Sequence, residues 1–187
     1  NMPAGEPLAK IGAEFEKNLD LLFHFAKKYG IIKQMESEIF TRRNEKMAIK
    51  MRVLCGSGKK KVLNLANEIK DHYSLAFNAV DVIPPAYPCD KERIVLLAIS
   101  AKKDINDTVR LFCKELTKAR AQNVALMIDG DEAVATKLKD ILTEAGTNVA
   151  DEVLYIDGGF PIFGTKLKDE EKTAAFAWVD RVMENLK

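Results

Sequence analysis

Five short apolar segments, separated by longer and more polar ones, recur along this chain of 187 residues. They are residues 51–55, 77–83, 93–100, 123–129 and 152–160. The third, RIVLLAIS, is apolar nearly throughout, as expected for a strand that is covered on both faces of a sheet. The second is followed by PPAYP, whose three prolines end any strand pairing there. We therefore predict five buried β-strands.

Amphipathic helices are predicted between most of these strands and after the last one. Apolar residues recur at three- and four-residue steps within 61–73, 106–122, 131–146 and 168–186. In the last of these helices, Ala174, Trp178, Val182 and Leu186 are expected to face inward. Because strands joined through helices run in the same direction, the predicted fold class is α/β: a three-layer, doubly wound, five-stranded parallel sheet.

A helical extension is predicted before the sheet. Seven apolar residues between positions 8 and 29 form one stripe, Gly30 follows as a helix stop, and a shorter helical piece spans about 31–40. We predict two parts, a helical arm or hairpin at 1–50 and an α/β domain at 51–187. The stripe needs a covering surface, either on its own domain or on a partner, and a homo-oligomer formed through the arm would supply one. The arm is also compatible with the tail of a larger protein of which this chain is a fragment.

Composition excludes several classes of function. The formal net charge of +1 gives no general attraction to nucleic acid or to acidic membranes, so we expect neither as a partner. No apolar run approaches 18 residues, and no secretory signal is recognised. Cys55, Cys89 and Cys113 are scattered, without a CxxC pair, and are predicted to be reduced thiols of a cytoplasmic protein. The two histidines lie in separate helical stretches, so no metal site is expected.

Ligands of open parallel sheets bind beyond the carboxyl ends of the strands, where the strand order reverses. Four predicted loops lie there: GSGKKK at 56–61, SAKKDIND at 100–107, DGDE at 129–132 and DGGFPIFG at 157–164. The first loop has neither the spacing of an ATP-binding Walker loop nor the dinucleotide pattern GxGxxG. It does combine glycines, a hydroxyl and three lysines at a predicted helix start, where backbone N–H groups favour an anion.

The candidate ligand-binding residues come from three of these loops. The lysines have two interpretations, either as phosphate partners that act as point charges or as the solvated edge of a turn. No GxSxG motif occurs and neither histidine lies at a strand end, so no catalytic residue is predicted and enzymatic activity stays open. The candidates are Ser57, Gly58, Lys59, Lys60, Lys61, Ser100, Asp129 and Gly130.

Residues 51–187 resemble the flavodoxin-like family of FMN-binding proteins. In that family the first loop reads roughly Ser/Thr-x-Thr-Gly-x-Thr, and its hydroxyls and amides wrap the FMN phosphate. The helix that follows has an apolar-Ala-x-x-Ile pattern, which LANEI at 65–69 matches, and alignment on this helix places 57–62 on the phosphate loop. Only Ser57 then matches the family motif. The segment 123–161 resembles the family as well, with a strand, a loop, a helix ending in EAG and a further strand.

The resemblance implies FMN as cofactor, with a function in electron transfer to a redox protein partner or as a small flavin reductase. The family usually flanks the flavin ring with aromatic side chains from the loops after the third and fourth strands. Those loops contain none in this sequence, and the nearest candidates are Tyr87, Phe160 and Phe163. The alternative hypothesis is a flavodoxin-like scaffold that has lost FMN and serves as a protein-interaction or regulatory module.

Overall fold

The structure, a computed structural model, describes residues 50–159 and 166–187. Its strands are β1 (Met51–Gly56), β2 (Val80–Val82), β3 (Glu92–Ala101), β4 (Ala121–Gly130) and β5 (Asn148–Tyr155). Its helices are α3 (Lys60–His72), α4 (Asp107–Glu115), α5 (Glu132–Glu144) and α6 (Asp169–Glu184), with a 3-10 turn, η1 (Phe77–Ala79), before β2. None of these described helices is long and apolar enough to cross a lipid bilayer. The predicted arm lies outside the described residues and stays a prediction.

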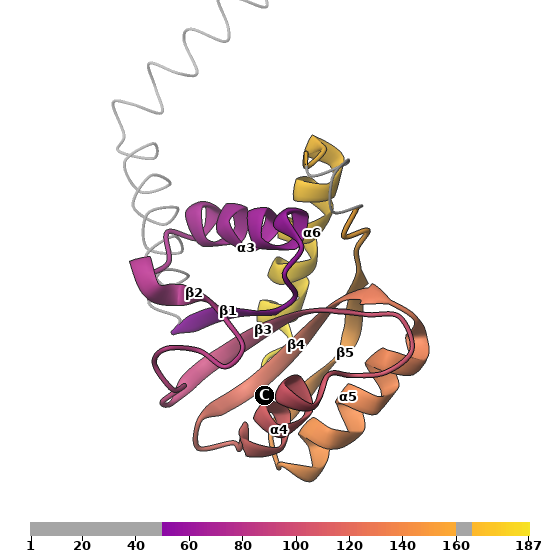
Figure 1. The fold of residues 1–187 in the computed structure, drawn as a ribbon. Helices are drawn as coiled ribbons and strands as arrows, with labels where there is room; N and C mark the ends of the chain where they lie inside the picture. Colours follow the sequence, from indigo (N-terminus) through magenta and orange to yellow (C-terminus); the bar gives the residue numbers. More distant parts are fainter. Residues whose placement is uncertain (1–49, 160–165) are drawn as a thin grey trace, which may run out of the picture. The chain divides into compact units, whose positions relative to one another are not determined.

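The strands form one sheet in the order β2-β1-β3-β4-β5, and all neighbouring strands are parallel (Figure 1). This confirms the predicted α/β class and the doubly wound, five-stranded sheet. The order is that of flavodoxin-like folds, in which the direction of winding reverses between the first and third strands. Those two strands pair over six residues each, from Met51 opposite Ile94 to Gly56 opposite Ile99.

Helices cover both faces of the sheet, which gives the three predicted layers. The core on one face joins the sheet to α3 and α6, and the core on the other joins it to α4 and α5 (Figure 1). Val53 and Leu54 are successive residues of β1, and each is fully buried in a different core. The middle of a central strand therefore has no side chain that faces water, which explains why these segments are apolar at nearly every position.

The connection between β2 and β3 crosses the sheet without a helix. The buried Arg52 of β1 donates a hydrogen bond of 2.7 Å to the carbonyl oxygen of Tyr87. The Asp81 carboxylate accepts a bond of 2.8 Å from the backbone N–H of Ala86 and lies 3.7 Å from the Arg52 guanidinium. These contacts hold the connection against the sheet. Since Arg52 is the second residue of β1, the backbone of Tyr87 lies toward the amino end of that strand.

The boundary between α4 and β4 differs from the prediction. The helix predicted at 106–122 ends at Glu115, and Ala121 already pairs with Glu92 of β3. Asn106 caps the helix as its sequence position suggests, because its side chain accepts a bond from the Thr108 N–H. The residues after the helix are mostly good helix formers, but the burial of Ala121 and its place in the sheet outweigh that intrinsic preference.

The two edge strands were predicted less accurately than the three central ones. The strand predicted at 77–83 is reduced to Val80–Val82, because the residues before it form the 3-10 turn. The strand predicted at 152–160 begins earlier, at Asn148, and ends at Tyr155. An edge strand is covered less completely than a central one and therefore contains more polar residues. For this reason a prediction from apolar runs places its ends less accurately.

The inward face of α6 agrees with the prediction except at its first residue, and Leu186 packs against the core as expected. Trp178 and Val182 are buried as expected, whereas Ala174 is exposed and Ala175 is buried in its place. Val179 completes the buried set, which follows the steps of three and four residues typical of a helix face.

The three cysteines are free and buried at separate places in the fold. Burial raises the pKa of the Cys55 and Cys113 thiols to about 12, and it also raises the pKa of Cys89. A thiol must lose its proton to act as a nucleophile or a metal ligand. At neutral pH these side chains therefore behave as small apolar groups of the core.

Gly130 ends β4 so close to β3 that a Cβ atom there would lie 1.8 Å from the carbonyl oxygen of Ala101. We expect Gly130→Ala to lower the free energy of unfolding by about 1–3 kcal/mol, because the clash is with backbone atoms. Gly58→Ala is the matched control, since nothing lies within 4 Å of a Cβ atom at that position. Urea denaturation of both variants measures the difference, and equal stabilities would contradict the close approach of the two strands.

Candidate functional site

The loops after β1 and β3 meet at the carboxyl edge of the sheet, at the point where the strand order reverses. The first loop is short, since β1 ends at Gly56 and α3 begins at Lys60. The hydroxyl oxygens of Ser57 and Ser100 share a hydrogen bond of 2.7 Å although the residues are 43 positions apart. Two hydroxyl groups from different strands therefore lie at the position where open parallel sheets bind their ligands.

Lys59 ties the first loop to β4. Its Nζ atom lies 2.6 Å from Oδ2 of Asp129, and the two side chains are 30% and 14% exposed. The Asp129 carboxylate also accepts hydrogen bonds from the Ser100 side chain and from the backbone N–H of Gly158. A Cβ atom at Gly158 would lie 2.1 Å from Oδ2 of Asp129, so a larger residue there would have to displace this carboxylate. The Asp129 carboxylate thus accepts hydrogen bonds from donors that lie at the ends of β1, β3 and β5.

The charge state of Asp129 follows from these contacts. Partial burial alone raises the pKa of its carboxyl group, but the hydrogen bonds from Lys59, Ser100 and Gly158 lower the pKa below its ordinary value. Hydrogen bonds that a carboxylate accepts stabilise its ionised form. The site therefore contains a fixed negative charge at neutral pH.

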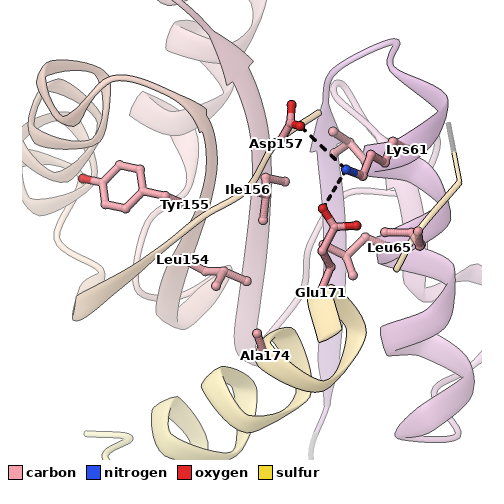
Figure 2. Close-up of a pocket in the computed structure, with 10 residues that line it drawn as sticks. Lys61, Leu65, Leu154, Tyr155, Ile156, Asp157, Glu171 and Ala174 are labelled. Atoms are coloured by element: carbon pink, nitrogen blue, oxygen red, sulfur yellow. Dashed lines mark hydrogen bonds and ion pairs between the residues drawn. The ribbon is translucent and has the colours of Figure 1, made fainter. Parts of the chain in front are cut away.

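Lys61 reaches from α3 toward α6 and the end of β5, and Figure 2 shows its ammonium group between two carboxylates. Its Nζ atom lies 2.7 Å from Oε1 of Glu171 and 3.9 Å from Oδ2 of Asp157. The Lys61 side chain is only 9% exposed, whereas that of Asp157 is 83% exposed, so Glu171 is the closer and better-covered partner. Partial burial raises the pKa of Glu171, but hydrogen bonds from the Lys168 N–H and from Lys61 lower it overall.

A cavity of about 120 Å³ lies beside the pair formed by Lys61 and Glu171 (Figure 2). Lys61, Asp157 and Glu171 form its charged end, and the ring of Tyr155 turns away from the other labelled side chains. The volume is well below the roughly 300–1,000 Å³ of pockets that enclose a drug-sized ligand. Aliphatic side chains line the rest of it: Val62, Leu65, Leu154, Ile156, Leu167 and Ala174.

The lysine run is largely neutralised within the fold. Lys59 pairs with Asp129, and Lys61 pairs with Glu171. Lys60 is exposed at the start of the helix. Two of the three lysines therefore serve as internal ion-pair partners, which neither interpretation of the sequence had included. They join α3 to β4 and to α6, so their first role is structural.

The start of α3 can hold an anion without the lysine side chains. The residue before the helix, Lys59, provides no side-chain cap, and the first turn contains no acidic residue. The backbone N–H of Lys59 donates to the Ser57 hydroxyl over 3.1 Å. The first N–H groups of a helix have no carbonyl partners within it and carry partial positive charge, so they favour a negative group. The hydroxyls of Ser57 and Ser100 lie next to this helix start.

The predicted site residues fall into three groups. The structure brings Ser57, Lys59, Ser100 and Asp129 into one connected cluster. Lys61 turns instead toward α6, and Gly130 is required by the contact between β3 and β4. The two remaining predicted residues, Gly58 and Lys60, are exposed beside the cluster.

Three residues of the site, Asp157, Gly158 and Glu171, were missed. Asp157 and Gly158 lie in the loop after β5, and their position at a strand end was the available signal. Glu171 lies in the first turn of α6, 110 positions from its partner Lys61. No local pattern distinguishes it from the acidic residues beside it, because its role depends on how α3 and α6 pack together.

The aromatic candidates for flanking a flavin ring are only partly described by the structure. Tyr87 lies toward the amino end of the sheet through its contact with Arg52, away from the carboxyl edge, and its side chain is 66% exposed. Phe160 and Phe163 lie outside the described residues. The described parts of the loops after β1, β3 and β4 provide no aromatic side chain, whereas Tyr155, the last residue of β5, places a half-exposed ring at the carboxyl end of its strand.

No protein-family model matches the chain, and no curated protein matches it either. Its function must therefore be inferred from the fold and from the side chains at the carboxyl edge. The all-parallel sheet in the order β2-β1-β3-β4-β5 is compatible with a flavodoxin-like fold. A fold of this kind supports many activities, so the side chains of the site must distinguish between them.

The pair formed by Lys59 and Asp129 should make stability depend on pH. Because the folded-state pKa of Asp129 lies below its ordinary value of 3.8, the stabilisation is fully present above that pH and is lost as the pH falls through the folded-state pKa. We expect Asp129→Asn to reduce the free energy of unfolding by about 1–3 kcal/mol near neutral pH. Urea denaturation at decreasing pH should show this gap closing below 3.8. A gap that stays constant would contradict an ionised pair.

Filling the cavity should stabilise the protein. Ala174 lines the cavity but is exposed on its other side, so a larger side chain can enter without displacing the core. We expect Ala174→Leu to raise the free energy of unfolding by about 1 kcal/mol. The control is Ala177→Leu, at an exposed position of the same helix, with an expected change within about 0.5 kcal/mol. Thermal or urea unfolding compares the two, and equal effects would contradict the entry of the new leucine side chain into the cavity.

Proposed function

We propose that the carboxyl edge of the sheet binds FMN and that the protein acts in electron transfer or as a small flavin reductase. The single observation that carries the proposal is the contact between Ser57 and Ser100 where the strand order reverses. A hydroxyl group from the loop after β1, a hydroxyl group from the end of β3 and an uncapped helix start converge there, which is the arrangement that binds phosphate groups in open parallel sheets.

The phosphate end of FMN fits these groups better than it fits the lysines. Lys59 and Lys61 are engaged by Asp129 and Glu171, so the Ser57 hydroxyl and the backbone amides at the start of α3 are the proposed phosphate ligands. Ser100 supports the position of Ser57 through their shared hydrogen bond. Lys60, which is exposed beside them, adds positive charge without a fixed geometry.

The ring end of FMN has fewer partners among the described residues. The cavity of about 120 Å³ is too small to enclose an isoalloxazine ring, so the ring is expected to lie across the loops of the edge. When bound, FMN supplies the redox chemistry, and the chain contributes binding, orientation and electrostatics. No acid–base side chain is needed for that task, and none is proposed. A redox protein partner is part of the same proposal.

A flavodoxin-like scaffold without cofactor is the second candidate. The ion pair between Lys59 and Asp129 favours it, because this pair closes the first loop against β4 with a contact of 2.6 Å. The lack of aromatic side chains in the described parts of the edge loops favours it as well. On this hypothesis the protein binds another protein, and the predicted arm at 1–50 is the docking element.

A visible absorption spectrum distinguishes the two candidates. We expect purified protein to bind added FMN, with the flavin absorption bands shifted and its fluorescence quenched. Ser57→Ala should weaken FMN binding about tenfold, because a hydrogen bond to a charged group is lost. The control is Thr143→Ala, which removes a hydroxyl from an exposed position of α5 and should leave binding unchanged. Protein that remains colourless and does not change the FMN spectrum would favour the scaffold.

A further inference from the structure

The Asp129 carboxylate already occupies the point where donors of the carboxyl edge converge. Lys59 donates to it over 2.6 Å, and it also accepts bonds from the Ser100 side chain and from the Gly158 N–H. Ser100 in turn contacts Ser57 over 2.7 Å. The Asp129 carboxylate is therefore connected, through the Ser100 hydroxyl, to Ser57, whose hydroxyl is proposed to bind the ligand phosphate.

We propose that Asp129 competes with the ligand phosphate for Lys59 and thereby sets the affinity of this edge for phosphorylated ligands. The inference rests on the proposed function and concerns the regulation of the same site. A phosphate beside Ser57 and the carboxylate of Asp129 are both negative, and one ammonium group cannot neutralise both. Binding of the phosphate is therefore coupled to weakening of the pair between Lys59 and Asp129.

The two partners differ in how far they can move. Asp129 is the next-to-last residue of β4 and pairs with Ser100 in the sheet, so its backbone is fixed. Lys59 lies in the loop before α3, its side chain is 30% exposed, and a lysine has four rotatable carbon–carbon bonds. Lys59 is therefore the partner that changes position, toward a phosphate held at the start of its own helix. Its backbone already adjoins that point, since its N–H donates to the Ser57 hydroxyl.

The test compares FMN with riboflavin, which carries the same ring but no phosphate. Asp129→Asn removes the charge with little change of shape, and an asparagine oxygen can still accept a bond from the Gly158 N–H. We expect this variant to bind FMN about tenfold more tightly than the wild type, because Lys59 becomes available to the phosphate. Affinity for riboflavin should not change. Fluorescence quenching titrations measure both constants.

Lys59→Met provides the opposite change in charge and should weaken FMN binding about tenfold, again with no effect on riboflavin. The double variant carries neither charge, so its affinity for FMN should return to near the wild-type value. Asp151→Asn is the matched control, since it removes one negative charge from an exposed residue in the amino-terminal half of β5. It should leave both affinities unchanged.

The outcomes separate this inference from the proposed function. If the wild type binds FMN and Asp129→Asn binds it no more tightly, the competition is refuted while the flavin site stands. An equal gain for riboflavin, or for the Asp151→Asn control, would also overturn it. If no variant binds FMN, both proposals fail. Circular dichroism melts verify that each variant is folded, and Lys59→Met gives an independent reading should Asp129→Asn not fold.

Discussion

The parallel pairing of β1 with β3 is the constraint on which the site depends. Six residues of each strand pair in register, although β2 and its connection lie between them in the chain. The helix that follows β1 packs on one face of the sheet, and the helix that follows β3 packs on the other face. Only the segments at the carboxyl ends of these two strands therefore meet. That geometry brings Ser57 to Ser100 and makes their contact a consequence of the topology.

Two ion pairs determine the net charge at the carboxyl edge of the sheet. Lys59 and Lys61 leave the same short segment in different directions, one to Asp129 of β4 and the other to Glu171 of α6. The segment that is most basic in the sequence is therefore close to neutral in the fold. An anionic ligand would be recognised mainly by hydroxyl and amide groups, and its affinity would depend on charges that also hold the elements together. Under the proposed function, structural and binding roles would share the same side chains.

Much of the fold could be predicted from the sequence, because the central strands are covered on both faces and therefore form apolar runs that are too short for buried helices. The edge strand β5 and the end of α4 were predicted less well, since sheet pairing rather than local composition fixes Ala121 and Asn148. For the site, strand ends indicated Ser57 and Asp129. Glu171 could not be found in this way, because its contact with Lys61 arises only when two distant helices pack together.

The central claim, that a phosphorylated flavin binds where β1 and β3 meet, is tested most directly by nuclear magnetic resonance of 15N-labelled protein titrated with FMN. The account predicts that the largest changes in amide chemical shift occur at Ser57–Lys61 and near Ser100, with smaller changes around Gly158. Changes confined to the amino end of the sheet, near Tyr87 and Glu92, or no changes with excess FMN, would contradict it.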